Sequence, residues 1–414
     1  MKITLHQIAI LLSVSFLISA CHSSDSPKAA APDYPWEEYG VAQFILMHQP
    51  GEELFDGVAH PAAGLFEGYF NVEEADKEHQ NYIKKLEDNG CRVITVSQIL
   101  NEVDLEALRD LAAQSLKYIP EDEAYRQDVL QKMNRSDLIR CILLRPTIHT
   151  QTTEHNTGVE AYYTHEPLMN LYFMRDQSIT TPRGTILCKM NSSQRARETA
   201  ILSLCYAHLG MTPYYIIQGE DSHLEGGDYF PFGTISLIGC GMRTDQNAIN
   251  EMFEHDAFGH DTVIVVRDHL FWQMQMHLDT HFNIIDRDLV TMCQNRYYAT
   301  PNDSSFLTCD IYVRDSTAEF GYARMQENIG FRQWLENRGI TIITINEADE
   351  MHYANNYLTI APRHICAIAH QSEDFAKALA DNNVTVDWIE AENLIQGYGA
   401  AHCMTQVILR SPVK

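Results

Sequence analysis

The stretch ARMQENIGFRQWLENRGITIITI, residues 323–345, decides the fold class. Ala323–Arg338 has the pattern of an amphipathic helix, and Gly339 is the residue type that commonly ends one. Thr341–Ile345 is a β-branched run typical of a buried strand. A helix that stops on glycine directly before such a strand is the unit of an α/β fold. This segment therefore predicts an α/β domain.

The same alternation extends outward from this segment, from Gln43 to the end of the chain. Other predicted helices are Glu73–Asn89, Gln194–His208, Gln246–Glu254 and Glu373–Asn382. Other predicted strands are Phe44–Met47, Val93–Val96, Thr185–Cys188, Tyr214–Ile217, Ile235–Ile238, Val263–Val266, Ile365–Ile368 and Met404–Leu409. The recurring unit of strands plus one helix favours a modular α/β fold. Gly239–Thr244 lacks the third glycine of a dinucleotide-binding fingerprint.

One block departs from the alternation. Between Val103 and Arg140, apolar residues recur at near-helical spacing, and Pro120 separates two helical stretches. The sequence therefore predicts an all-helical insertion at about residues 103–140.

The N-terminus has the features of an export signal. Lys2 precedes an apolar run, Ile8–Ile18, which is short for a membrane span and suits a signal-peptide core. The run ends in Leu17-Ile18-Ser19-Ala20-Cys21, which resembles the lipidation site of bacterial lipoproteins. We predict a signal peptide at 1–20, a lipid on Cys21, a tether over 21–35 and a catalytic domain over 36–414, attached to a bacterial membrane on its periplasmic or outer side. The alternative is an ordinary cleaved signal with an incidental cysteine.

Composition narrows the class of ligand. The chain has 414 residues, is 45% hydrophobic and carries a formal charge of −26, so it can build a sizeable core. Such a charge disfavours nucleic acid, whose phosphates need basic partners, and suits a small cationic ligand. Nine cysteines remain besides Cys21, an odd number that leaves at least one unpaired. No CxxC pair indicates a zinc knuckle or a redox site.

Two segments contain acidic residues at positions where a buried core would be destabilised by charge. An apolar run ends in Arg175-Asp176, and a glycine pair separates Glu225 from Asp228. Taken alone, the first could be a structural salt bridge and the second a polar turn.

Two further segments carry histidine and cysteine. His277, Asp279 and His281 would share one face of an extended strand, which is a typical acid–base arrangement. Small residues from Gly397 lead to His402-Cys403, so we predict an exposed thiol where a loop meets a strand. A zinc site is the competing interpretation, with donors from His255, His260, His277 and His281.

Together the four segments predict one kind of chemistry. Carboxylates bind a guanidinium group through paired hydrogen bonds. A thiolate can attack its planar carbon, and a histidine can give a proton to the leaving amine and then activate water.

The sequence resembles the arginine deiminases, in the guanidino-group-modifying or pentein superfamily, from about Val41 to Pro412. The resemblance rests on Leu46–Leu54, Leu65–Glu67, Asn170–Asp176, Arg195, Glu198-Thr199, Leu224–Asp228, Arg243-Thr244, His277–Thr280 and His402–Thr405. It implies a five-fold pseudosymmetric α/β propeller of ββαβ modules with a helical insertion, and no metal or organic cofactor.

The resemblance also implies residue roles. Cys403 corresponds to the nucleophile, His277 to the general acid/base, Asp176 and Asp279 to the carboxylates that hold the guanidinium, and Glu225 to the acid supporting His277. The corresponding substrate-binding positions are Leu65, Asn170, Phe173, Arg195, Arg243, Gly397, Tyr398 and His402, with the two arginines addressing the α-carboxylate.

Three features depart from the family pattern. Tyr398 stands where an arginine usually contacts the substrate, Glu67-Gly68 replaces an Asp-Asp pair, and the lipoprotein-type leader is unusual. The leading hypothesis is hydrolysis of L-arginine to L-citrulline and ammonia. Tyr398 keeps another guanidine open as substrate, such as agmatine, a methylated arginine or a peptidyl arginine. A non-catalytic arginine-binding lipoprotein is a third hypothesis, and the sequence leaves room for a homo-oligomer.

Overall fold

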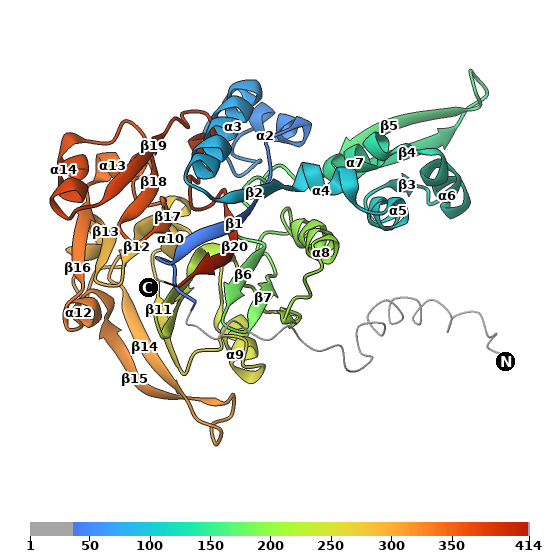
Figure 1. Cartoon of the computed structure of the whole chain (residues 1–414). Coiled ribbons are helices and arrows are strands. Elements are labelled where there is room, and N and C mark those ends of the chain that lie inside the picture. Colours follow the sequence, from blue (N-terminus) through green and yellow to red (C-terminus); the bar gives the residue numbers. More distant parts are fainter. Residues whose placement is uncertain (1–35, 413–414) are drawn as a thin grey trace. The chain divides into compact units, whose positions relative to one another are not determined.

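Five small sheets repeat one topology in the computed structural model, which describes residues 36–412 (Figure 1). In each, the middle strand pairs antiparallel with one neighbour and parallel with the other, and a helix lies in the chain between the parallel strands. The first two modules are β6 (Ser178–Thr181), β7 (Gly184–Leu187), α8 (Glu198–His208) and β8 (Tyr215–Ile216), and then β9 (Tyr229–Phe232), β10 (Ile235–Cys240), α9 (Gln246–Glu254) and β11 (Thr262–Arg267). The next two are β12 (Phe282–Asp286), β13 (Leu289–Cys293), α12 (Phe331–Glu336) and β16 (Thr341–Ile345), and then β17 (Leu358–Ala361), β18 (His364–Ile368), α14 (Glu373–Asp381) and β19 (Thr385–Ile389). The fifth is β20 (Gln406–Ser411), β1 (Val41–Met47), α3 (Val72–Asp88) and β2 (Arg92–Thr95). This is the ββαβ repeat that the family resemblance implies, and it agrees with the recurring unit of strands plus one helix in the sequence.

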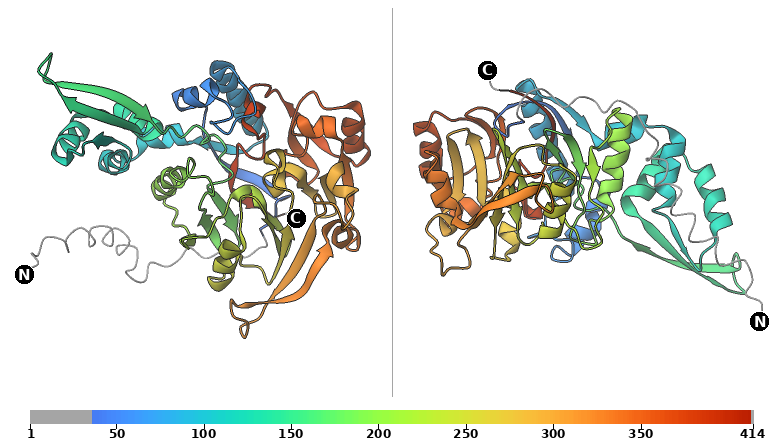
Figure 2. Two further views of the ribbon diagram at one scale, coloured as in Figure 1. Left: turned by 180° about the vertical axis from the view of Figure 1, so that it is seen from behind. Right: turned by 90° about the horizontal axis from the view of Figure 1, so that it is seen from below.

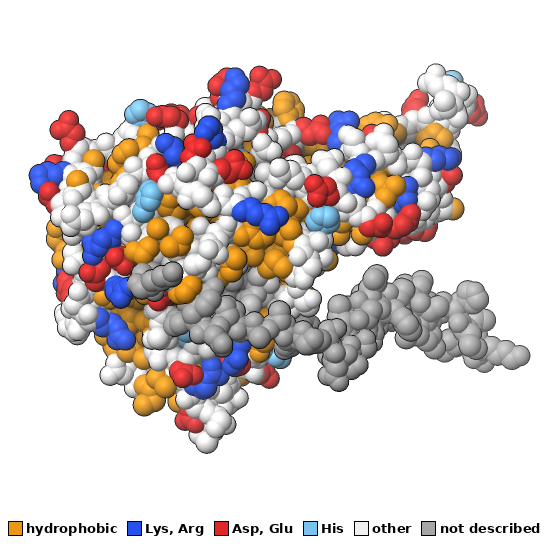
Figure 3. All heavy atoms as spheres, viewed as in Figure 1, with side chains coloured by type: hydrophobic (Ala, Val, Ile, Leu, Met, Phe, Trp, Pro, Cys, Tyr) orange, Lys and Arg blue, Asp and Glu red, His pale blue; other side chains and the backbone are white. Residues whose placement is uncertain are grey.

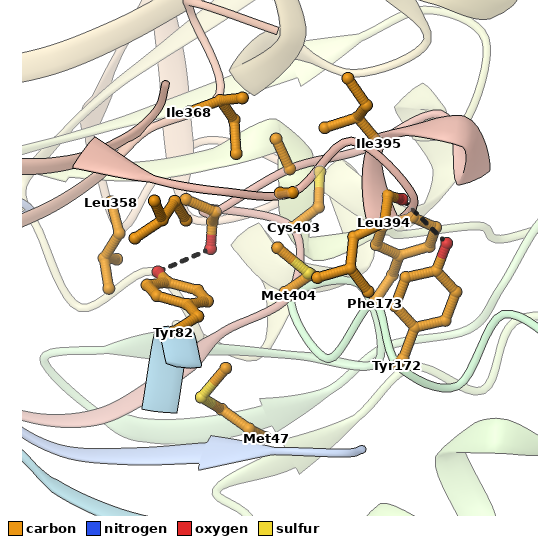
Figure 4. Close-up of a cluster of buried hydrophobic side chains, with 14 of the residues drawn as sticks. Met47, Tyr82, Tyr172, Phe173, Leu358, Ile368, Leu394, Ile395, Cys403 and Met404 are labelled. Carbon is orange, nitrogen blue, oxygen red and sulfur yellow. Dashed lines mark hydrogen bonds between the residues drawn. The ribbon is translucent and has the colours of Figure 1, made fainter. Parts of the chain in front are cut away.

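The fifth module joins two distant parts of the chain. β1 pairs antiparallel with β20 and parallel with β2. Cys403 lies three residues before β20, so this pairing brings the Cys403 loop against the first strand and α3. The hydroxyl of Tyr82 on α3 donates a 3.1 Å hydrogen bond to the carbonyl of Ala401 in that loop (Figure 4).

Buried polar side chains connect neighbouring modules. Gln406 on β20 donates to the carbonyl of Ser178 on β6 at 2.6 Å. Arg410 on β20 donates to the carbonyl of Thr359 on β17 at 2.7 Å, and the hydroxyl of Thr359 donates to the carbonyl of Ile284 on β12 at 2.6 Å. Each bond therefore links a side chain of one module to a backbone carbonyl of the next.

The predicted strands are all confirmed, and α3, α9 and α14 match their predicted helices within a residue. α8 begins at Glu198, four residues later than predicted. The helix predicted over Ala323–Arg338 is wrong in its first half, where β15 (Tyr322–Gly330) pairs with β14 (Thr308–Arg314). β15 is the edge strand of its sheet and is mostly exposed, so no buried face imposes a period of two on its sequence.

The insertion is α/β rather than all-helical. Its helices α5 (Leu105–Ala113), α6 (Glu123–Lys132) and α7 (Arg135–Leu144) begin at side-chain caps from Asp104, Asp122 and Asn134. Between α5 and α6 lies the strand β3 (Lys117–Ile119), which pairs parallel with β4 (Pro146–Thr152). β4 pairs antiparallel with β5 (Val159–His165), so the inserted unit continues past Arg140 (Figure 2). β3 is three residues long, too short to interrupt the helical pattern visibly.

Short helical elements fill the connections between the sheets. They are η2 (Glu52–Leu54), α2 (Phe55–Ala59), α4 (Val96–Glu102), η3 (Gly226–Asp228), η4 (Gln273–Gln275), α10 (Leu278–His281), α11 (Gln294–Tyr297), α13 (Glu347–Met351) and η5 (Leu394–Gly397). Within residues 36–412, no helix has the length and apolar character to cross a membrane. The predicted signal peptide and Cys21 lie outside the described residues.

Candidate active site

One cavity collects most of the predicted site residues. Its wall contains Leu65, Asn170, Phe173, Asp176, Arg195, Arg243, His277, Gly397, Tyr398 and Cys403, together with Gln273 and Met276. Glu225, Asp279 and His402 are buried behind this wall and contact the residues that form it. The structure therefore brings together all the catalytic positions inferred from the resemblance.

Cys403 is buried, which corrects the prediction of an exposed thiol. Its side chain is 4% exposed, and its Sγ lies 3.1 Å from Nδ2 of Asn356 and 3.5 Å from Oδ2 of Asp279. The loop is compact because it carries glycine: a Cβ on Gly399 would lie 2.6 Å from the Phe173 ring and 3.0 Å from the Cβ of Cys403. Figure 4 shows Phe173, Leu394 and Met404 around the thiol.

The surroundings of the Cys403 thiol disfavour its anion. Burial, with the nearby carboxylates of Asp279 and Asp176, raises the pKa of Cys403 well above its ordinary value. The free site therefore holds a neutral thiol at neutral pH. A cation placed between the carboxylates and the sulfur would lower that pKa.

His277 forms a buried pair with Glu225. Nε2 of His277 lies 2.8 Å from Oε2 of Glu225, and its Nδ1 lies 3.8 Å from Oδ1 of Asp176. Burial lowers the pKa of His277, but Asp176, Glu225 and Asp228 outweigh it and raise that pKa to about 9. The imidazole is therefore protonated at neutral pH and can act as an acid.

The local structure around His277 differs from the predicted strand. His277 is the N-cap of the one-turn helix α10, so His277, Asp279 and His281 point to different partners. Asp279 turns toward His402 and Cys403, whereas Nε2 of His281 lies 3.4 Å from Asp268. His281 consequently takes no part in the cavity.

One carboxylate oxygen of Asp176 forms an ion pair with Arg195, and the other has no hydrogen-bond partner. Nη1 of Arg195 lies 2.6 Å from Oδ2 of Asp176, and the same guanidinium pairs with Glu198. Oδ1 of Asp176 and Nδ1 of His277 are buried and have no hydrogen-bond partner. An unsatisfied buried carboxylate oxygen is costly, so a ligand that donates to it would bind favourably.

Asp279 is held by His402. Nδ1 of His402 lies 2.7 Å from Oδ2 of Asp279, and Nε2 of His402 lies 3.5 Å from Glu38. Burial raises the pKa of Asp279, but the hydrogen bond from His402 and its charge lower it below the ordinary value. His402 thus orients Asp279 from behind, and it does not line the cavity as a substrate-binding residue would.

The remaining wall combines one basic side chain with aromatic and backbone groups. Nη2 of Arg243 donates to Oε1 of Gln273 at 3.1 Å, and its Nη1 lies 3.8 Å from Glu225. Arg195, by contrast, is occupied by two carboxylates. Leu65 and Tyr398 both adopt a left-handed backbone conformation, with φ of 59° and 67°.

Sequence reasoning missed three residues. Gln273 and Met276 line the cavity, and their position just before His277 is a signal that could have been used. Asn356 contacts Cys403 from a segment between α13 and β17 that carries no recognisable motif.

The metal hypothesis can be compared with the donor geometry. Among the described residues, Asp176, Glu225 and His277 offer ligand atoms within 4.8 Å of one another. In this trio Nε2 of His277 is already bonded to Glu225, as expected for an acid–base pair. The four histidines of the zinc hypothesis do not converge: His260 bonds Ser236 and His281 lies beside Asp268.

Comparisons with known proteins identify the family of this chain. The family model described as arginine deiminase matches residues 63–410. The arginine deiminase of Halobacterium salinarum is 26% identical over 500 aligned residues, which cover 94% of this chain and 100% of the relative. The arginine deiminase of Metamycoplasma hominis is 25% identical, over 92% of this chain and 97% of the relative.

Solved structures share the fold. The N-terminal domain of ArgZ, covalently bound to a reaction intermediate, is 14% identical with a TM-score of 0.55, covering 89% of this chain and 98% of that one. DDAH of Pseudomonas aeruginosa, complexed with citrulline, is 14% identical with a TM-score of 0.53, covering 88% and 98%. Both are pentein-superfamily proteins, which confirms the predicted fold class. Because the family model spans most of its length, the chain belongs to the arginine deiminase family.

Proposed function

We propose that this protein hydrolyses L-arginine to L-citrulline and ammonia through a covalent intermediate on Cys403. The observation that carries the proposal is the convergence of the Cys403 thiol, the His277–Glu225 pair and the unpartnered oxygen of Asp176 at one buried cavity. Family membership and the names of the relatives support the same reaction.

Substrate binding follows from the carboxylates. A guanidinium entering the cavity would donate to Oδ1 of Asp176, which lines it, and to Oδ1 of Asp279, which lies behind the wall next to Cys403. Both are buried oxygens without a hydrogen-bond partner. At its other end, Arg243 is the cavity guanidinium without a carboxylate closer than 3.8 Å, so it is the better partner for the α-carboxylate. On the face drawn in Figure 3, acidic residues lie among basic ones. We assign recognition to the cavity because its carboxylates have oxygens without partners.

The first chemical step forms the covalent intermediate. The bound cation offsets the charges of Asp176 and Asp279 and so lowers the pKa of Cys403, and the thiol gives its proton to solvent water. The thiolate then attacks the guanidinium carbon and forms a C–S bond. His277, as its imidazolium, gives a proton to one nitrogen, the C–N bond breaks and ammonia leaves.

The second step consumes water. Neutral His277 takes a proton from a water molecule as the water oxygen bonds to the thiouronium carbon. The C–S bond then breaks, the hydroxyl on the former thiouronium carbon gives its proton to the departing thiolate, and neutral citrulline is released. Glu225 keeps the imidazole oriented in both steps because it holds Nε2 at 2.8 Å.

The direct test is product analysis of the purified chain incubated with L-arginine, beside Cys403→Ala. We expect citrulline and ammonia in equal amounts from the wild type and neither from the variant. If the wild type binds arginine and releases no ammonia, the protein is a binder and the proposal is wrong.

A second candidate substrate class rests on Tyr398. This residue lines the cavity where the family pattern has an arginine, so the site offers one fewer fixed positive charge to a carboxylate. Agmatine has no α-carboxylate, and peptidyl arginine has it bound in an amide, so both place less demand on such a charge. Methylated arginines keep the α-carboxylate and differ from arginine at the guanidine. Comparing kcat/KM for arginine with that for each of these decides between them, and a value for arginine well below the others would favour the second candidate.

We also propose that the protein is exported and anchored by a lipid on Cys21. Lys2, the apolar run Ile8–Ile18 and the sequence ending in Cys21 support this proposal. Labelling bacterial cells that express the chain with a fatty-acid analogue should mark the wild type and leave Cys21→Ala unlabelled. Recovery of unlabelled wild-type protein in the soluble fraction would contradict the anchor.

A further inference from the structure

Asn356 makes two hydrogen bonds with Cys403 and two more with the loop that carries it. It precedes β17 and is fully buried. Its Oδ1 accepts hydrogen bonds from the backbone N–H groups of Ala400 and Cys403 at 3.0 and 3.1 Å. Its Nδ2 donates to Sγ of Cys403 at 3.1 Å and to the carbonyl of Asp279 at 3.2 Å. The backbone carbonyl of Asn356 accepts from the N–H of His402 at 3.0 Å.

These contacts answer an electrostatic problem at Cys403. Asp279 and Asp176 disfavour a sulfur anion, and within residues 36–412 no lysine or arginine contacts Sγ to balance them. A fixed cation there would repel the guanidinium that the site must bind. An amide N–H stabilises the thiolate without a net charge, so it favours the anion and still admits a cationic substrate.

We propose that Asn356 is a further catalytic residue, whose amide N–H holds the Cys403 thiolate while its carbonyl oxygen fixes the loop that carries the thiol. The inference rests on the proposed function for its place in the reaction. Its physical content, a hydrogen bond that favours the sulfur anion, concerns the protein without substrate.

The ionisation of Cys403 is set by several groups besides Asn356. The titratable side chains that face the thiol come from α10, the segment before β6, the turn before β17 and the loop itself: Asp279, His277, Asp176, Tyr172, Tyr353 and His402. A test of Asn356 must leave these unchanged. Asn356→Asp leaves these side chains in place and keeps the shape and an acceptor for the two backbone N–H groups. It removes the donor to Sγ and to the carbonyl of Asp279 and adds a carboxylate, so a variant without that charge must accompany it.

Asn355 provides the matched control. It is the neighbouring residue and is equally buried, but its Oδ1 accepts from Thr291 at 2.6 Å and does not contact Cys403. Asn355→Asp therefore introduces the same change of side chain one residue away from the nucleophile. Asn356→Ser is a second variant, with a shorter side chain and no added charge, and thermal unfolding shows that each variant is folded.

The experiment measures the rate of Cys403 alkylation by iodoacetamide against pH, on the full chain without substrate, by mass spectrometry of the peptide that contains Cys403. We expect Asn356→Asp and Asn356→Ser to react about 10- to 100-fold more slowly at neutral pH, with profiles displaced to higher pH. Asn355→Asp should match the wild type. We also expect kcat for citrulline formation to fall in the Asn356 variants by a similar factor.

Two results would overturn the inference. One is an unchanged alkylation profile in both folded Asn356 variants. The other is an equal displacement in Asn355→Asp, which would mean that any change in this turn has the same effect. If the profile shifts as expected while the wild type makes no citrulline, the proposed function fails and the role of Asn356 toward the thiolate stands.

Discussion

The buried Glu225 carboxylate offers a sharp test of how His277 is tuned. Its Oε2 lies 2.8 Å from Nε2 of His277, and its Oε1 accepts from the backbone N–H of Asn191 at 2.9 Å. Glu225→Gln keeps the shape of the side chain and an acceptor oxygen but removes the negative charge. The variant therefore isolates the electrostatic effect of Glu225 on His277.

The size of the effect can be estimated from the contacts. Burial alone lowers the pKa of His277, and Asp176, Glu225 and Asp228 raise it to about 9. Removing one adjacent carboxylate should lower that pKa by about 2 units, or about 2.7 kcal/mol. Because His277 acts first as an acid, the wild type should keep its activity up to about pH 9. The variant should lose activity above about pH 7, which is roughly a 10-fold difference at pH 8.

Folding stability should follow the same sign. A histidine whose pKa is raised in the folded state contributes stability that is fully present below its unfolded pKa of about 6.5. This contribution is lost as the pH rises through about 9 in the wild type. In Glu225→Gln it should be smaller and should disappear at lower pH. Urea unfolding at a series of pH values measures it.

The assay is the pH dependence of kcat/KM for citrulline formation. The control is Glu53→Gln, because Glu53 forms an equally buried pair with His48 at 3.0 Å and neither residue lines the cavity. In Glu53→Gln, kcat/KM should decrease at the same high pH as in the wild type. If Glu225→Gln shows the wild-type profile, the acid is not His277 or its pKa is not set by Glu225.

Three other predictions test separate parts of the site. Cys403→Ser should lower kcat by at least about 10⁴-fold and leave arginine binding measurable by calorimetry; turnover near the wild-type rate would remove Cys403 from the reaction. Gly227→Ala should lower kcat by about 100-fold, because a Cβ there would lie 2.8 Å from the His277 ring; unchanged kcat would mean that the ring can move freely. Exhaustive chelation should leave kcat unchanged, since Nε2 of His277 is engaged by Glu225; loss of activity that zinc restores would favour a metal centre at Asp176, Glu225 and His277.

The modular fold was predictable because its signals are local. Strands such as Val263–Val266, which is buried, and Thr341–Ile345, which is partly buried, are β-branched runs with polar or glycine residues near their ends. Fully buried β12 and β13 were missed because short apolar runs carry no period that separates strand from helix. β15 was mistaken for a helix because its exposed side chains follow backbone pairing with β14 rather than a buried face.

Site residues could be predicted where they lie in a sequence segment that is itself recognisable. Glu225 and Cys403 belong to segments with recognisable composition, and the structure places both as expected at one site. The burial of Cys403 was not predictable, because it packs in one core cluster with residues from distant parts of the chain, such as Phe173, and α3 bonds its loop at Ala401. The role of Asn356 could not be predicted for the same reason. It depends on contacts between the segment before β17 and the Cys403 loop, which are far apart in the sequence.

The most direct test of the account is to trap the intermediate. L-Arginine mixed with the enzyme and quenched in acid within one turnover should leave an arginine-derived adduct, less one ammonia, on the peptide that contains Cys403. The adduct should disappear as citrulline accumulates, and Cys403→Ala should show none. Citrulline formed at the wild-type rate with no adduct at any time, or an adduct on another cysteine, would contradict the central claim.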